Sequence, residues 1–172
     1  MKNIFQRFCV FIFFISLSFY SCEDSIEGCI DELACNYNSE ATETLPGACN
    51  YPIEEILEVI YMDAVVSGSV GEDIISHVHI RNSSCNTVSL IARKIYNGSE
   101  ETSAYFCFSG VCFSSDTVVS PIALTLDSFQ EDDYFKGYFS SSIPGEFQVT
   151  YRFYLEEDPT ISVEVDITYM VS

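Results

Sequence analysis

The final part of the chain, from Ile161 to Val171, alternates apolar and polar residues along its whole length. Successive side chains of an extended strand point to opposite faces of a sheet, so this pattern predicts a strand with one buried face. The same alternation occurs between Phe147 and Leu155 and again between Ile74 and Arg81. Half-buried strands are therefore the main element that this sequence predicts.

Between residues 55 and 172, runs of this type are separated by turns rich in Gly, Pro, Asn and Asp. Their spacing predicts about seven or eight strands, with no helix beyond one turn near Pro52–Leu57. Many short strands at such spacing are typical of an antiparallel β-sandwich. We therefore expect an all-β, immunoglobulin-like sandwich over residues 55–172.

Residues 1–21 have the features of an export signal. Lys2 and Arg7 make the start positive, and residues 8–20 form an apolar run about half as long as a comfortable membrane span. Cys22 follows Ser21 and precedes polar sequence. This arrangement resembles a bacterial lipoprotein signal. The resemblance implies that residues 1–21 are removed, that Cys22 is the lipidation site, and that the protein reaches the outer membrane, facing the periplasm or the cell surface.

The net charge of the chain is −19 at pH 7, and removal of Lys2 and Arg7 with the signal would make it more negative. Such a charge repels nucleic acid and anionic lipid headgroups, so neither is an expected partner. The expected partners are the membrane, through the N-terminal lipid, and a protein or glycan ligand that the sequence does not identify.

Six cysteines follow Cys22, and an even number in an exported chain favours disulfides. Cys107 and Cys112 flank a short loop, in which a structural bridge is favoured over thiol redox chemistry. The other pairings are not determined by the residues alone. The six are Cys29, Cys35, Cys49, Cys85, Cys107 and Cys112.

After an acidic tether at residues 22–27, residues 28–52 form a cysteine-rich module that must be held by crosslinks because it is too short to bury a core. It resembles a module of exported Bacteroidetes proteins, and that resemblance implies a Cys29–Cys49 bridge with Cys35 as an extra cysteine. Cys35 could then pair with Cys85, compete with Cys29 for Cys49, or stay free together with Cys85. The matching residues are Gly28, Cys29, Asp31, Ala34, Asn36, Tyr37, Asn38, Ala41, Thr42, Gly47, Cys49 and Tyr51.

The later part of the chain carries a second resemblance. The paired cysteines of YFCFSGVCF, followed by a strand containing Gly145, Phe147, Val149 and Tyr151, are similar to immunoglobulin-like domains of Bacteroidetes envelope proteins. That resemblance implies the same sandwich fold and a place in the cell envelope.

Two weak metal sites can be considered. His77 and His79 are spaced i, i+2 on one strand face and could hold zinc with a carboxylate from a neighbouring strand, although polar surface residues explain them more simply. In the module, oxygen atoms could bind calcium, but a disulfide-pinned spacer is the favoured role. The oxygen-bearing candidates are Asp31, Asn36, Asn38 and Glu43.

The sequence contains no motif for nucleophilic catalysis, zinc hydrolysis or phosphate binding. We therefore predict no enzyme, no catalytic residue and no cofactor. The expected function is that of a lipid-anchored cell-envelope protein that acts as a binding or structural module. A metal-binding protein or enzyme using His77 and His79, or a calcium-stiffened surface spacer, are the alternatives. Binding is expected through loops 68–73, 107–112, 130–133 or 156–160.

Overall fold

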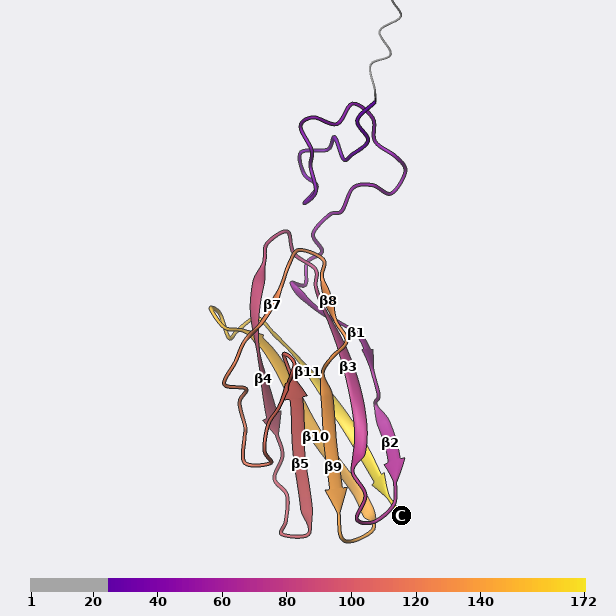
Figure 1. Ribbon diagram of the computed structural model, residues 1–172, viewed down its shortest axis with the longest axis vertical. Helices are drawn as coiled ribbons and strands as arrows, with labels where there is room; N and C mark the ends of the chain where they lie inside the picture. The colour runs from indigo at the N-terminus through magenta and orange to yellow at the C-terminus, as the bar shows by residue number, and fades with distance from the viewer. Residues whose placement is uncertain (1–24) are drawn as a thin grey trace, which may run out of the picture.

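A computed structural model describes residues 25–172 of the 172-residue chain. The expected signal peptide at residues 1–21 and the lipidation site Cys22 lie outside the described residues. Two β-sheets pack face to face into an elongated sandwich, with the cysteine-rich module beyond one end and the C-terminus at the other end (Figure 1). Within residues 25–172, no helix is long and apolar enough to cross a membrane.

The first sheet has the strand order β1-β3-β9-β5-β6, and β8 pairs with β3 beside this path. Its pairs are all antiparallel. Its strands are β1 (Leu57–Met62), β3 (Ile74–Asn82), β5 (Thr102–Phe108), β6 (Val111–Cys112), β8 (Glu131–Asp132) and β9 (Lys136–Ser141).

The second sheet has the strand order β2-β11-β10-β4-β7. The long β10–β11 hairpin is its centre and is paired from Gly145–Val171 to Tyr154–Ser162. Its strands are β2 (Val65–Gly68), β4 (Val88–Ile95), β7 (Leu124–Leu126), β10 (Gly145–Leu155) and β11 (Ser162–Val171).

The all-β sandwich agrees with the sequence-based prediction, and two details differ. The structure has eleven strands within residues 25–172 instead of seven or eight, because β6, β7 and β8 are only two or three residues long. The sandwich is also not wholly antiparallel, since β2 runs parallel to β11. The chain leaves the first sheet after Met62 and enters the second at Val65 without turning back, which gives β2 the direction of β11.

The helical turn expected near Pro52–Leu57 is not formed. This segment has no helical residues, and β1 begins at Leu57. Its backbone instead hydrogen-bonds to the end of β3: Ile53 donates to the Ser83 carbonyl and Ser83 donates to the Ile56 carbonyl. Backbone groups near a packed surface need such partners, so pairing with the sandwich keeps this segment extended.

The inward faces of both sheets form one core that is rich in aromatic rings. Phe135, which follows β8, is fully buried at its centre and lies against Tyr151 and Phe153 at centroid distances of 4.9 and 4.8 Å. Both rings meet Phe135 nearly edge to face, the geometry that aromatic pairs prefer. The alternating apolar residues of β10 and β11 thus point inward, as their sequence pattern predicts.

Candidate functional site

The cysteine-rich module is held by its own polar side chains and by the Cys29–Cys49 disulfide. The Asn36 side chain binds the segment around Cys49 on both sides: its amide donates to the Ala48 carbonyl and its oxygen accepts from the Asn50 backbone N–H. Cys29, Cys49 and Asn36, three of the residues that carry the module's resemblance, therefore have a structural role. Side-chain hydrogen bonds replace the large core that a segment of this size cannot form.

Three of the four residues considered as calcium ligands, Asp31, Asn36 and Asn38, already accept hydrogen bonds through their side-chain oxygens. The Asp31 carboxylate accepts from the Leu33 backbone N–H and from the Tyr51 hydroxyl, and these two bonds lower the pKa of Asp31. The Asn38 side chain accepts from the Glu40 backbone N–H. These bonds explain the polar residues without a bound ion, and calcium binding stays a prediction.

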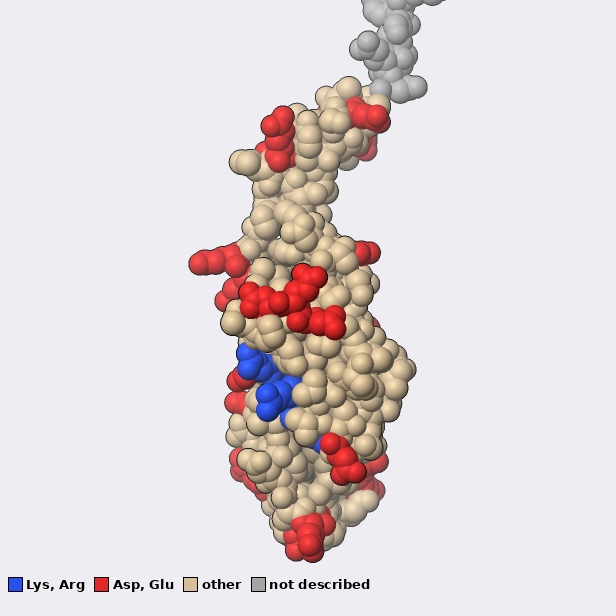
Figure 2. All heavy atoms as spheres, turned by 90° about the vertical axis from the view of Figure 1, so that its left-hand side faces the viewer, with Lys and Arg blue, Asp and Glu red and all other residues tan. Residues whose placement is uncertain are grey.

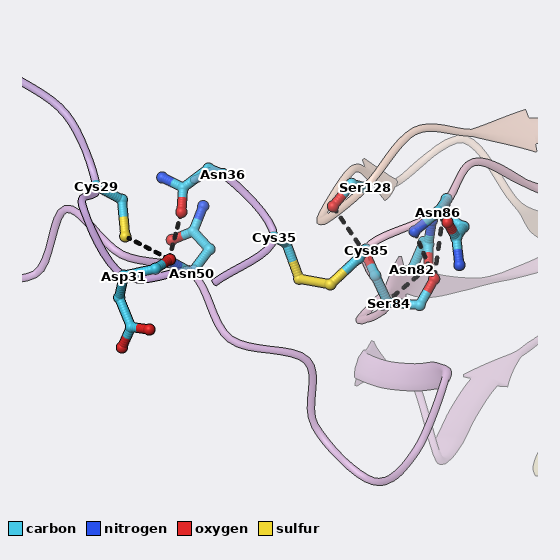
Figure 3. Close-up of a disulfide and its surroundings, with 10 residues drawn as sticks. All are labelled: Cys29, Asp31, Cys35, Asn36, Asn50, Asn82, Ser84, Cys85, Asn86 and Ser128. Atoms are coloured by element: carbon cyan, nitrogen blue, oxygen red, sulfur yellow. Dashed lines mark hydrogen bonds between the residues drawn. A yellow bond between two sulfur atoms is a disulfide. The ribbon is translucent and has the colours of Figure 1, made fainter. Parts of the chain in front are cut away.

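The disulfide between Cys35 and Cys85 joins the module to the sandwich (Figure 3). This pairing is one of the three alternatives that the sequence leaves open. Cys85 lies in the β3–β4 turn, which is the part of the sandwich nearest the module (Figure 1). The module is therefore connected to the sandwich twice, once through residues 50–56 and once through sulfur.

The turn that carries Cys85 is stabilised by Asn82, a fully buried residue at the end of β3. Its side-chain amide donates to the carbonyls of Leu126 and Asp127, and its oxygen accepts from the backbone N–H of Ser84. Figure 3 shows Asn82 beside the disulfide, with its hydrogen bonds to Ser84 and Asn86. The covalent link therefore starts from a fixed point of the sandwich and not from a loose loop.

The third disulfide, Cys107–Cys112, closes the β5–β6 hairpin. Beyond it, the chain follows the outer edge of β4, where the Ala92 carbonyl accepts from the Ser120 backbone N–H.

Lys94 on β4 is buried beneath this segment, with only 6% of its surface exposed, and its Nζ donates to the carbonyls of Ala104 and Ser115. Burial lowers the pKa of Lys94, and Asp116 partly opposes that effect. Sequence reasoning missed this residue, although Lys94 shares the inward face of β4 with Leu90 and Ala92.

His77 and His79 both lie on the outward side of β3, as their alternation indicates, but they have different neighbours. The His77 ring Nδ1 is 3.0 Å from the Asp63 carboxylate, whereas the His79 ring packs against Tyr61 at a centroid distance of 4.8 Å. Within residues 25–172, no three His, Cys, Asp or Glu side chains are arranged to hold a metal ion. A zinc role for the two histidines stays a prediction.

A groove of about 500 Å³ lies at the end of the sandwich away from the module. One wall is the loop after β4, and the other is the beginning of β10. Tyr96 shapes the loop, because its hydroxyl donates to Thr102 and its ring packs edge to face on the core residue Phe139. Gly98 fits beneath this pair only because it has no side chain: a Cβ there would lie 2.3 Å from the Tyr96 ring.

The loops named from the sequence are not brought together. Loop 68–73 lies at the groove end, where the Gly71 N–H donates to the Ser141 carbonyl. Loop 130–133 lies at the module end, where the Gln130 carbonyl accepts from Asn82. Separate groups of acidic side chains are scattered over the visible face from the module to the groove end, with one small basic group halfway along the sandwich (Figure 2).

No known protein family and no curated protein matches this chain by sequence. The N-terminal domain of PorA resembles it with a TM-score of 0.46 and 14% identity, over 68% of this chain and 96% of that domain. A conjugative transposon lipoprotein from Bacteroides eggerthii has a TM-score of 0.41 and 11% identity, over 66% of this chain and 93% of that one. The CARDB domain of a Pyrococcus furiosus protein, in complex with di-metal ions, has a TM-score of 0.39 and 14% identity, over 73% of this chain and 98% of that domain. At these values the likenesses are distant, and they assign neither a family nor a ligand.

Proposed function

We propose that this chain is a lipid-anchored cell-envelope protein whose immunoglobulin-like sandwich serves as a binding or structural module and not as an enzyme. The module of residues 28–52 would act as a braced stalk between the membrane and the sandwich. The surface offered to a partner would then be the end of the sandwich farthest from the anchor, which contains the groove beside Tyr96 and β10.

The observation that carries this proposal is the Cys35–Cys85 disulfide. A flexible tether alone would let the sandwich adopt any orientation relative to the membrane. A second, covalent connection into a turn fixed by Asn82 limits the freedom of the sandwich relative to the module, so that only the short tether at residues 22–27 stays between this joined unit and the lipid. A protein that only needed to be retained at a membrane would not need a fixed orientation, whereas one that must present a particular end outward would.

Three further features support the proposal. Disulfides accumulate in proteins of oxidising compartments, and three of them occur within residues 25–172. The short apolar run before Cys22 resembles a lipoprotein signal, and the module resembles one found in exported Bacteroidetes proteins. The polar oxygens of the module are used for its own hydrogen bonds, which favours a spacer over a reactive centre.

The anchor is tested by replacing the proposed lipid site. Cys22→Ala should move the protein from the membrane fraction to the soluble fraction, because the remaining apolar run is too short to hold it. Cys9→Ala, which changes the other cysteine of the N-terminal segment, is the matched control and should stay with the membrane. A Cys22→Ala protein that still sediments with membranes would contradict lipid anchoring.

Orientation is tested by protease treatment of intact cells, with a periplasmic protein as the control. Digestion of this chain while the control survives would place the sandwich on the cell surface. Protection of both would place it in the periplasm. In either case the Cys35→Ala/Cys85→Ala variant should be cut faster between residues 50 and 56 once a protease has access, because that segment would lose its parallel covalent link.

A further inference from the structure

One edge of the central strand β10 is only half covered. β10 begins at Gly145, and its pairing with β11 starts there as well. Its pairing with β4 starts only at Thr150, which lies opposite Ile95, the last residue of β4. Residues 145–149 therefore have a neighbouring strand on the β11 side alone.

The direction of the backbone groups at this edge follows from the ladder. In antiparallel strands, alternate residues direct both their N–H and their C=O toward the same neighbour. Leu155 donates to the Ile161 carbonyl on the β11 side, and Glu156 donates to the Ser89 carbonyl on the β4 side. Even-numbered residues of β10 thus face β4, so the backbones of Glu146 and Gln148 face the uncovered edge.

The opposite strand supports this assignment. Thr168 pairs with Gln148 but donates its N–H to the Ala64 carbonyl, away from β10. Gln148 and Thr168 are therefore a pair without mutual hydrogen bonds. Within residues 25–172, no backbone or side-chain group outside the sheet ladders bonds to the backbone of Glu146 or Gln148.

The groove occupies the space that a longer β4 would fill. After Ile95 the chain turns toward the first sheet, where Tyr96 packs on Phe139 and bonds to Thr102. The groove of about 500 Å³ is left between this loop and residues 146–150 of β10. That volume lies in the range of about 300–1,000 Å³ that is usual for small-molecule pockets, so the groove has room for side chains of a partner. An extended peptide is the shape that matches a free strand edge, because its backbone completes the ladder.

The charge of this end indicates which peptide would bind. Glu146 lies in the groove, and Glu72, Glu100 and Glu101 are exposed on the adjoining loops. Of the basic side chains near the groove, Lys94 is bonded to two carbonyls, and Arg152, which pairs with Arg93 just beyond Thr150, is bonded to the Pro159 carbonyl and the Ser162 hydroxyl. A second copy of this chain would bring the same acidic end into contact with itself. A segment with Lys or Arg side chains is complementary instead.

We propose that the uncovered edge of β10 binds an extended segment of another protein, carrying basic side chains, which adds as a strand beside Glu146 and Gln148. This names a partner class for the binding role proposed above and rests on that role, but it does not depend on lipid anchoring. The anchor and the strand-addition site are tested by separate experiments, so that either can fail alone.

The open edge is tested first by amide hydrogen exchange on the purified, disulfide-bonded full chain. The amides of Phe147 and Val149 should be protected by β11, whereas those of Glu146 and Gln148 should exchange at nearly the rate of an unfolded peptide. Protection of all four amides in the free protein would overturn the proposal, because the edge would then already be covered.

Binding is tested with two capped hexapeptides, KVKVKV and EVEVEV, followed by NMR. We expect KVKVKV to shift and protect the amides of Glu146 and Gln148 at millimolar concentration, and EVEVEV to leave them unchanged. No response to KVKVKV, an equal response to EVEVEV, or a response confined to another surface would each overturn the proposal.

Two variants separate strand addition from general charge attraction. Gln148→Pro removes the N–H that faces the edge without removing a bond to β11, and it should weaken KVKVKV binding by about fivefold relative to Gln148→Ala. Glu146→Gln should also weaken it, whereas Glu157→Gln, beyond the opposite end of β10, should not. Equal binding by the Pro and Ala variants, both checked for an unchanged amide spectrum elsewhere, would exclude a backbone-paired strand.

Discussion

The hydroxyl oxygens of Ser76 and Tyr169 lie 2.7 Å apart in the core and connect the two sheets. Ser76 is on β3 and Tyr169 on β11, and neither has any exposed surface. The Ser76 hydroxyl also lies 3.3 Å from the Gly137 carbonyl on β9. This small polar contact is surrounded by aromatic rings, where a hydrogen bond is strong and an unpaired polar atom is costly.

Replacing Tyr169 with Phe should therefore destabilise the sandwich by about 1–3 kcal/mol, because the Ser76 hydroxyl would lose its partner across the sheets. Chemical denaturation measures this difference. Tyr138→Phe, on the outward face of β9, is the matched control and should change the unfolding free energy by less than about 0.5 kcal/mol. If the two variants are equally stable, the inter-sheet hydrogen bond does not contribute to folding.

Acid should weaken the point where the chain changes sheets. Asp63, between β1 and β2, accepts hydrogen bonds from the Tyr61 hydroxyl and from the backbone N–H of His77. Burial raises the pKa of Asp63, but these bonds and the nearby His77 ring outweigh burial, so the net pKa lies below its ordinary value. The stabilisation is present above the pKa of the unfolded chain, about 3.9, and disappears as the pH falls through the lower folded value.

Asp63→Asn should accordingly be less stable than the unaltered chain at pH 7, and this difference should shrink as the pH falls below about 4. Thermal unfolding between pH 2 and pH 7 gives the comparison. Asp133→Asn, at an exposed position for which no such contacts are found, serves as the control. A constant difference between Asp63→Asn and the unaltered chain across this range would show that the carboxylate charge has no role at the strand switch.

Lys94→Met should loosen the segment that covers β4. The methionine would fill similar space, but the carbonyls of Ala104 and Ser115 would lose their donor, at a cost of about 1–3 kcal/mol. Faster amide exchange at residues 115–120 than in the unaltered chain would be the local sign. Arg93→Met, the neighbouring exposed position, should leave these amides unchanged. Unchanged exchange in Lys94→Met would mean that the ammonium does not hold the segment.

Removing the Cys35–Cys85 disulfide should cost more than removing Cys107–Cys112. The first spans 50 positions and the second only 5. Chain entropy then predicts that the free energy of unfolding falls by about 4 kcal/mol without Cys35–Cys85 and by about 2 kcal/mol without Cys107–Cys112. Double Cys→Ala variants of each pair, compared by denaturant unfolding, test the order. The reverse order would indicate that the module contributes little to the folded state beyond its own residues.

The parts of this fold that were predicted from sequence are those whose pattern is local. The alternation from Ile161 to Val171 matches β11, and the run from Phe147 to Leu155 lies within β10. Ile74 and its alternate neighbours are buried along β3, as their spacing indicates. A strand with one apolar face carries this information in its own residues.

The missed features depend on distant segments. Nothing in Val65–Gly68 specifies that it pairs in parallel with β11, because that depends on where the chain changes sheets. The free edge beside Gln148 exists only because β4 ends five residues too early to cover it. Lys94 could have been found from its inward position on β4, but a buried lysine contradicts the usual exposure of that residue.

The Cys35–Cys85 bond also determines how the molecule would respond to mechanical pulling. Tension applied from the N-terminal side passes at Cys35 through sulfur to Cys85 and then directly into β4. The chain between the two cysteines, including β1, β2 and β3, lies in a closed covalent loop beside this route. Without the disulfide, this force would peel β1 from the edge of the first sheet. With it, the force is carried by a covalent bond, and β1 and β2 bear none of the load.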